Sequence, residues 1–264
     1  MSEKKVRIGF VGTGIIAKWH LKNLQAVPEA SVVALCDLDE ARAKAFAEPL
    51  GAVVYTDGER LLKECPLDGL YVCVPPFAHG DVEIRAAERG IHLMVEKPVN
   101  LSYAKAREVC QAIQKAGVMS QAGYRRRYEP SSLQLKAFLA DKVVGAAQVI
   151  RWSEVPNMPW WGVYRKSGGQ LLEQTTHQVD LLRWVMGEVR AVAASYSFNR
   201  VFKGRPGLDV PDSQSALLIF ESGASATIRE ACTVPANVAS EFPAESARVV
   251  ANSPLKLWTS APRV

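Results

Sequence analysis

The fold class of this 264-residue chain follows from one stretch near its start, Val6-Arg7-Ile8-Gly9-Phe10-Val11-Gly12-Thr13-Gly14-Ile15-Ile16-Ala17. An apolar run typical of a buried strand is followed by a glycine-rich turn and then by helical spacing. Gly12 permits a tight turn, Gly14 lets the backbone approach a pyrophosphate, and Ala17 allows close packing of helix on strand. The first helical turn offers N–H groups to phosphates. The stretch predicts a dinucleotide-binding unit, the alternative being an ordinary strand-to-helix turn.

An acidic residue ends the second expected strand. Asp37 follows Ala17 by 20 residues. A carboxylate there can accept both hydroxyls of an adenosine ribose and would repel a 2′-phosphate. The spacing therefore predicts NAD as the cofactor, with NADP as the alternative because Arg42 lies close by. The other interpretation is that Asp37 only begins the next turn.

Strand-like and helical segments alternate along residues 1–122, which is typical of parallel strands joined by right-handed crossovers. The expected strands are Val6–Val11, Ser31–Asp37, Val53–Tyr55, Gly69–Val74, His92–Val95 and Val118–Ala122. The expected helices are Gly14–Ala26, Asp39–Phe46, Asp81–Arg89 and Tyr103–Ala116. Because the strands are apolar almost throughout, both faces of the sheet should be covered. We predict an α/β Rossmann domain over residues 1–122.

The pattern changes near Gly123, where longer strand-like runs begin. These runs are Ala146–Ser153, Val189–Ser197, Ser213–Phe220, Ala224–Ala231 and Ala247–Trp258. Helices are expected near Ser131–Ala140 and over about Leu171–Met186. Residues 123–264 should therefore form an α+β domain with a mostly antiparallel open sheet.

Composition excludes several classes of protein. The net charge is +5, with 48% hydrophobic and 22% charged residues, as in an ordinary globular protein. The basic run Arg125–Arg127 is too short to indicate a nucleic-acid surface. No apolar stretch reaches the ~18–20 residues that span a bilayer, and no signal peptide is recognisable. With no CxxC pair and four scattered histidines, we expect a cytoplasmic protein without a metal site, a nucleic-acid partner or a membrane partner.

A lysine follows the fifth expected strand, in Glu96-Lys97-Pro98. The carboxyl ends of parallel strands open onto the ligand crevice, so Lys97 should lie beside the nicotinamide of a bound cofactor. Its ammonium can bind a substrate oxygen and stabilise an alkoxide. A surface lysine after a strand is the alternative interpretation.

A second group of polar residues falls on the helix expected after Gly168. Glu173 and His177 are i and i+4, and Asp180 follows on nearly the same face. A carboxylate beside an imidazole fixes its tautomer and raises its basicity, which suits a general base. The alternatives are a solvated polar pair and a helix-capping histidine.

Other polar residues have two interpretations each. Pro75 and His79 follow the fourth strand, and His79 either faces the cofactor or caps the next helix. Trp161 and Arg165 suit a pocket for sugars or carboxylates, or are a core tryptophan and a surface cation. Tyr124 is a further candidate for substrate binding, or only part of the corner between the domains.

In combination, these motifs resemble those of the Gfo/Idh/MocA oxidoreductases, the family of glucose-fructose oxidoreductase and inositol 2-dehydrogenase. The matching pieces are Gly12–Ala17, Asp37, Pro75 with His79, Glu96-Lys97-Pro98, Gly123–Pro130, and Gly168-Gly169 before Glu173, His177 and Asp180. The resemblance implies an N-terminal Rossmann domain and a second domain that binds substrate and joins subunits of a homo-oligomer through its sheet. It assigns the family's lysine to Lys97 and its histidine base to His177. Glu173 stands where the family usually has aspartate.

The resemblance also implies sugars, polyols or related hydroxy compounds as substrates. The expected cofactor-binding residues are Gly12, Thr13, Gly14, Ile15, Ile16, Ala17, Asp37, Pro75, His79, Glu96 and Lys97. The expected substrate-binding residues are Lys97, Tyr124, Trp161, Arg165, Glu173 and His177, of which Lys97, His177 and Glu173 are catalytic. Because family members usually extend well beyond 264 residues, the second domain is expected to be either naturally short or truncated at its C-terminus.

The resulting hypothesis is an NAD(P)-dependent oxidoreductase that transfers a hydride between a small hydroxy compound and nicotinamide. One alternative keeps NAD but uses transient oxidation for glycoside cleavage, with no net redox change. Another is a dinucleotide-binding sensor without turnover.

Overall fold

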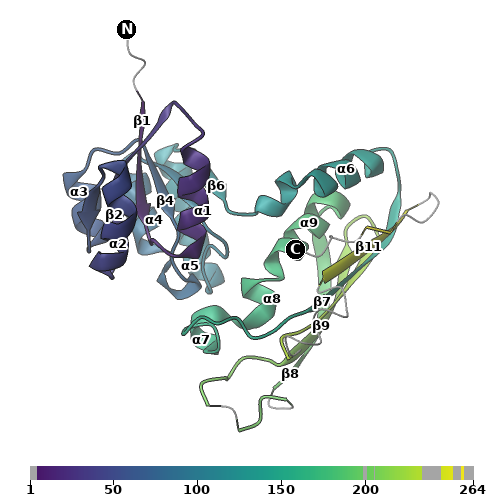
Figure 1. The fold of residues 1–264 in the computed structure, drawn as a ribbon. Coiled ribbons are helices and arrows are strands. Elements are labelled where there is room, and N and C mark those ends of the chain that lie inside the picture. The colour runs from purple at the N-terminus through teal and green to yellow at the C-terminus, as the bar shows by residue number, and fades with distance from the viewer. Residues whose placement is uncertain (1–4, 199–200, 205, 234–244, 252–256, 259–264) are drawn as a thin grey trace. The chain divides into compact units, whose positions relative to one another are not determined.

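The computed structural model describes residues 5–198, 201–204, 206–233, 245–251 and 257–258. The chain divides into two compact units, Met1–Gly123 and Tyr124–Val264 (Figure 1). Each unit has a six-stranded sheet of its own.

The sheet of the first unit is parallel throughout. Its strands are β1 (Val6–Val11), β2 (Ala30–Cys36), β3 (Val53–Tyr55), β4 (Gly69–Val72), β5 (His92–Val95) and β6 (Ser120–Ala122). Their order is β3-β2-β1-β4-β5-β6. The chain runs outward from β1 to β3 and then returns to β4, so the strand order reverses between β1 and β4. In such sheets ligands bind at this switch point, beyond the carboxyl ends of the strands.

Helices cover both faces of this sheet, as the apolar strands predict. On one face, α1 (Ile15–Leu24) and α2 (Glu40–Ala47) pack against strand residues such as Phe10 and Leu35. On the other face lie α3 (Gly58–Glu64), α4 (Asp81–Glu88) and α5 (Tyr103–Ala116). Helix α3 was not predicted, because only Leu61 and Leu62 of its seven residues are buried.

The second unit contains a mixed sheet. Its strands are β7 (Val144–Trp152), β8 (Val189–Ser197), β9 (Ser213–Phe220), β10 (Ser225–Ala231), β11 (Glu245–Ala251) and β12 (Leu257–Trp258). The order is β12-β11-β7-β10-β9-β8, and every pair is antiparallel except β7 with β10. The mostly antiparallel prediction is thus confirmed. Within the expected strand Ala247–Trp258, residues 252–256 lie outside the described residues.

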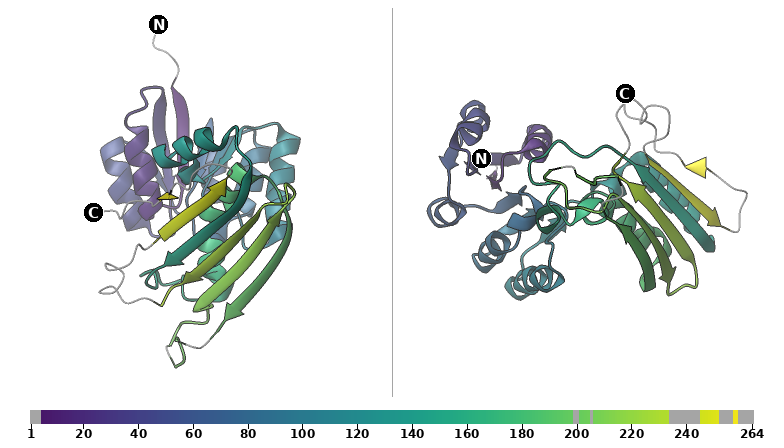
Figure 2. Two further views of the ribbon diagram at one scale, coloured as in Figure 1. Left: turned by 90° about the vertical axis from the view of Figure 1, so that its right-hand side faces the viewer. Right: turned by 90° about the horizontal axis from the view of Figure 1, so that it is seen from below.

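One face of the second sheet is covered by helices, as Figure 2 shows. Leu182 and Met186 of α9 (Thr176–Met186) pack against β7, β9 and β10. The remaining helices of the unit are α6 (Pro130–Leu139), α7 (Tyr164–Ser167) and α8 (Gly169–Glu173). Short 3-10 helices occur at η1 (Glu48–Leu50), η2 (Pro76–Ala78) and η3 (Arg125–Tyr128).

The single helix expected over Leu171–Met186 is wrong. The chain forms α8 and α9 with a break between Glu173 and Thr176. At the break, the amide of Thr175 bonds to Gln170 five residues earlier, and that of His177 to Gln174 three residues earlier. The i,i+4 argument for Glu173 and His177 therefore does not hold on one continuous helix.

No helix in the described ranges combines the length and apolarity needed to cross a membrane. Nor do three His, Cys, Asp or Glu side chains gather as metal ligands would in that part of the chain.

Candidate functional site

The glycine turn lies at the switch point between β1 and β4. Gly12 has a φ of +88°, and a Cβ there would lie 2.4 Å from the carbonyl oxygen of Cys73 on the β4 side. A Cβ at Gly14 would meet no atom within 4 Å, so the space beside the turn is open. Ala17 is fully buried in the core beneath α1, and Ile15 begins that helix. The turn therefore has both the tight bend and the open approach that a pyrophosphate requires.

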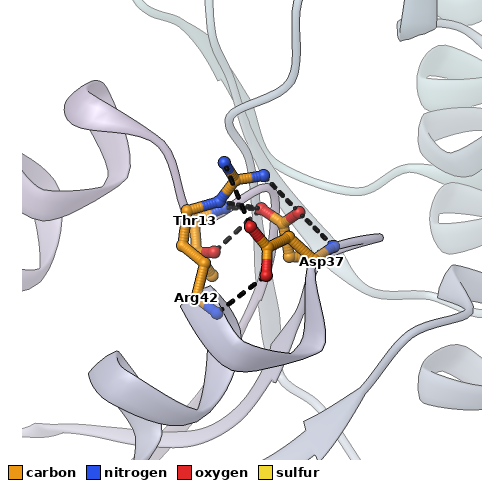
Figure 3. Close-up of polar contacts among 4 residues, drawn as sticks. Thr13, Asp37 and Arg42 are labelled. Carbon is orange, nitrogen blue, oxygen red and sulfur yellow. Dashed lines mark hydrogen bonds and ion pairs between the residues drawn. The ribbon is translucent and has the colours of Figure 1, made fainter.

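Asp37 ties this turn to the end of β2. Thr13 donates its N–H and its hydroxyl to Oδ2 of Asp37, both at 2.8 Å, as Figure 3 shows. Arg42 of α2 donates Nη2–H to Oδ1 at 2.7 Å and Nε–H to Oδ2 at 3.3 Å. The amide N–H of Asp39 also donates to Oδ1, so the two oxygens of the carboxylate accept five hydrogen bonds in all. The carboxylate expected to hold the ribose thus also fixes the glycine turn.

The pKa of Asp37 responds to two opposing effects. Burial alone would raise it, but hydrogen bonds from Arg42, Asp39 and Thr13 lower the pKa to about 2. Asp37 is therefore an anion throughout the neutral range and holds Thr13 and Arg42 as a charged acceptor.

Glu96 and Lys97 lie at the carboxyl end of β5, as expected. Glu96 is buried, and its Oε1 lies 2.8 Å from Nε2 of His20 on α1. Its Oε2 accepts the amide N–H of Lys97 at 3.2 Å. Gly123 leaves room for the carboxylate, since a Cβ there would lie 2.7 Å from it. Sequence reasoning missed His20; the available signal was its place on α1, three residues after Ala17.

His79 lies just before α4 and is tied to that helix by its side chain. Its side chain is fully buried, and Nδ1 lies 2.6 Å from Oε1 of Glu83. Glu83 also accepts the amide N–H of Gly80, which caps α4. Pro75 is half-buried and precedes η2, beside the switch point. These contacts anchor the start of α4, while Nε2 of His79 is buried without a hydrogen-bond partner among the described residues, and the cofactor-binding role of His79 stays a prediction.

Trp161 also differs from the prediction. Its side chain is fully buried among Phe202, Val210 and Cys232, so the ring does not line an open pocket. Its indole Nε1–H donates to Oε2 of Glu173 at 3.0 Å. The substrate-binding role expected of Trp161 is therefore corrected to orientation of the Glu173 carboxylate.

Tyr124 and His177 meet at the start of α9, and Glu173 is the last residue of α8, just before the break. His177 and Glu173 are each 8% exposed. The rings of Tyr124 and His177 meet edge to face with centroids 6.0 Å apart, and the Tyr124 hydroxyl lies 3.2 Å from Oγ1 of Thr176. Tyr124, Thr176 and His177 therefore form one cluster of the second unit, and Glu173 is bonded to Trp161.

Asp180 and Arg165 do not join this cluster. Asp180 accepts two hydrogen bonds from Arg127, at 2.7 Å to Nε and 2.5 Å to Nη2, and so fixes η3 against α9. Arg165 is exposed on α7, and no hydrogen bond or ion pair links it to another residue in the described part of the chain. The substrate-binding role of Arg165 stays a prediction.

Family models identify both units. Residues 6–124 match the model described as an oxidoreductase family with an NAD-binding Rossmann fold. Residues 133–246 match the model of the Gfo/Idh/MocA C-terminal domain. The chain belongs to the Gfo/Idh/MocA oxidoreductases. This confirms the predicted family, the NAD-binding Rossmann fold of the first unit and the class of enzyme.

Relatives in the family support the same conclusion. The myo-inositol 2-dehydrogenase of Thermotoga maritima is 32% identical over 227 residues, 84% of this chain and 67% of that protein. The D-glucoside 3-dehydrogenase of Escherichia coli is 29% identical over 214 residues, 76% of this chain and 60% of that protein. The WlbA dehydrogenase of Chromobacterium violaceum, solved with NADH and UDP-GlcNAcA, is 25% identical with a TM-score of 0.83, over 95% of this chain and 72% of that one.

Proposed function

We propose that this oxidoreductase is an NAD-dependent dehydrogenase that oxidises a secondary alcohol of a polyol or sugar. The observation that carries the proposal is the glycine turn at the strand switch point, with open space at Gly14 and Asp37 fixed beneath it. The choice of substrate class is supported by the relatives named as inositol and glucoside dehydrogenases.

The residues of the first unit suit NAD. Gly12 and Gly14 admit the pyrophosphate, and the first turn of α1 presents the N–H groups of Ile15, Ile16 and Ala17, which have no partner within the helix. Asp37 is anionic and lies where an adenosine ribose would be recognised. When bound, NAD accepts the hydride that leaves the alcohol carbon.

Three side chains would handle the remaining proton and charge. His177 accepts the hydroxyl proton as the carbon–hydrogen bond breaks, so the alcohol becomes a ketone. Glu173 is held by Trp161 and favours the protonated imidazole that results. Lys97 has an ammonium that can donate a hydrogen bond to a substrate oxygen and stabilise the negative charge that develops there.

The test is a panel of inositols, sugars and glycosides with NAD, following NADH by its absorbance. Lys97→Ala and His177→Ala should each lower turnover about 10²–10⁴-fold. NADH affinity should change little in either variant, because neither side chain belongs to the phosphate turn. Lys18→Ala, an exposed change on α1, is the control.

Three outcomes would contradict the proposal. Full activity in either variant would remove its assigned role. Product formation without NADH would favour transient oxidation with no net redox change. NADH binding without turnover across the panel would favour a sensor.

We also propose that the second unit forms a homo-oligomer through the outer face of its sheet. Ala193, Leu217 and Thr227 are neighbours across β8, β9 and β10, and all three are exposed. Leu217→Glu should dissociate the oligomer in light-scattering measurements, because it places a charge in an apolar interface. Arg229→Glu changes the charge at the next outward-facing position of β10 on the same face. This variant tests whether a charge change on that face is enough to dissociate the oligomer.

A further inference from the structure

The adenosine end of the proposed cofactor site contains a contact that a strict NAD site does not need. Asp37, the residue that would recognise the ribose, is already paired with Arg42. The inference below rests on the proposed cofactor function and specifies which cofactors that site accepts.

The carboxylate of Asp37 has no acceptor capacity left. Oδ1 accepts from Asp39 and Arg42, and Oδ2 accepts twice from Thr13 and once from Arg42. A carboxylate offers about four lone-pair sites, and five donors are present. A ribose hydroxyl can therefore donate to Asp37 only if one of these donors leaves.

Arg42 is the donor that can leave. Thr13 is 1% exposed and its backbone belongs to the phosphate turn, whereas the Arg42 side chain is 49% exposed at the start of α2. The amide of Asp39 is fixed by its place before that helix. The flexible, half-exposed guanidinium can swing away at small cost, while the other partners of Asp37 stay in place.

Arg42 also removes the usual barrier to a 2′-phosphate. An unpaired aspartate at the end of the second strand repels that phosphate, but here a guanidinium lies on the carboxylate and offsets its charge. The same contact raises the pKa of Arg42 further, so the cation persists at all working pH values. Its Nη1 is 3.8 Å from Oδ2 of the exposed Asp39 and can turn to a new acceptor.

We propose that Arg42 forms a 2′-phosphate subsite, so that this chain binds NADP(H) as well as NAD(H). With NADP(H), the planar guanidinium binds the phosphate through two N–H groups, a geometry that suits arginine better than lysine. With NAD(H), the Arg42 side chain moves away from Asp37, and the carboxylate then accepts hydrogen bonds from the ribose hydroxyls. The ion pair between Asp37 and Arg42 is thus the element that sets cofactor choice.

Dissociation constants for NADH and NADPH, measured by calorimetry on the purified chain, test this proposal without requiring a substrate. The wild type should bind both, with constants within about tenfold of each other. Arg42→Ala should weaken NADPH binding about 10–100-fold, the loss of a charge-assisted pair. Its NADH binding should be unchanged or tighter, because Asp37 is then open to the ribose.

Two matched variants sharpen the test. Lys44→Ala removes one positive charge from the exposed face of α2, where Lys44 pairs with Glu40 and not with Asp37, and should leave both constants unchanged. Arg42→Lys keeps the positive charge but loses the two parallel N–H donors of the guanidinium. Its dissociation constant for NADPH should lie between those of the wild type and Arg42→Ala.

The contrary outcomes are distinct. Wild-type binding of NADH with no binding of NADPH would overturn the 2′-phosphate subsite and leave the proposed function standing. If Arg42→Ala weakens the binding of NADH and NADPH equally, Arg42 only stabilises the loop around Asp37. That result would overturn its role in cofactor choice. A wild type that binds neither cofactor would overturn the proposed function and this inference together.

Discussion

Nε2 of His20 lies 2.8 Å from Oε1 of Glu96, which joins the helix after the glycine turn to the end of β5. Glu96 in turn accepts the amide N–H of Lys97. Tyr71 packs edge to face against the His20 ring and limits its rotation. The backbone that bears the proposed catalytic lysine is therefore held by a histidine from another element.

His20→Ala should lower kcat by about tenfold or more while changing KM and the NADH dissociation constant little, because small displacements of a reacting group reduce rate more than binding. His20→Asn, which keeps a side-chain donor, should recover part of the loss. Lys18→Ala, exposed on the same helix, is the control. A parallel loss of kcat and NADH affinity would instead indicate collapse of the glycine turn.

The two glycines of the phosphate turn should respond differently to alanine. Gly12→Ala forces a Cβ to within 2.4 Å of a backbone oxygen at a positive φ, so the protein should be destabilised by several kcal/mol. Gly14→Ala meets no atom and should keep the wild-type melting temperature, yet lose NADH binding because the Cβ occupies the approach of the pyrophosphate. Thermal melting and calorimetry separate the two effects. Undiminished NADH binding by Gly14→Ala would contradict the proposed position of the phosphates.

Trp161→Phe tests the support of Glu173. The change keeps most of the buried ring but removes the indole N–H that donates to Oε2 of Glu173. Loss of this buried hydrogen bond should cost about 1–3 kcal/mol of unfolding free energy. Turnover should also fall, since the Glu173 carboxylate, proposed to support the base, loses the hydrogen bond that orients it. Trp160→Phe, a half-buried neighbour in the same core, should have the smaller effect on turnover. Equal effects of the two variants would mean that only packing matters.

Much of the fold could be predicted because its signals are local. Strands β1, β3, β5, β8 and β9 have the bounds expected from their apolar runs. Helix α5 likewise has its predicted bounds, between Ser102 and Gly117. Helix α3 was missed although Asp57 caps it by accepting the amide N–H of Arg60, a signal present in the sequence. A short helix with two buried residues has too weak an apolar pattern to be recognised as a helix in the sequence.

The site was harder to predict because its contacts are not local. The place of Asp37 follows from the end of a strand, so its proximity to the turn was foreseeable. His20 and Glu96 are 76 residues apart, and the bond between Trp161 and Glu173 crosses a loop that has no periodic pattern. The break between α8 and α9 occurs within unbroken helical spacing, where the Thr175 hydroxyl donates to Glu230 of β10. Such tertiary contacts override local preference and leave no mark in the spacing.

Glu230 gives the protein a pH-dependent stability of definite sign. Burial raises its pKa from 4.5 to about 7, against the opposing effects of the Thr175 hydroxyl and the Arg151 charge. The folded state thus holds this proton more tightly than the unfolded chain. The free energy of unfolding should therefore fall as pH rises from about 4.5 to about 7, by up to about 3 kcal/mol.

Glu230→Gln removes this titration and keeps the size of the side chain. The melting temperature of the variant relative to wild type should therefore rise between pH 5 and pH 8, because only the wild type has to bury a charge at the higher pH. Glu221→Gln, an exposed change at the turn between β9 and β10, should show no such trend. A difference that stays constant with pH, or shrinks as pH rises, would mean that Glu230 is ionised at little cost and that Arg151 compensates its charge in full.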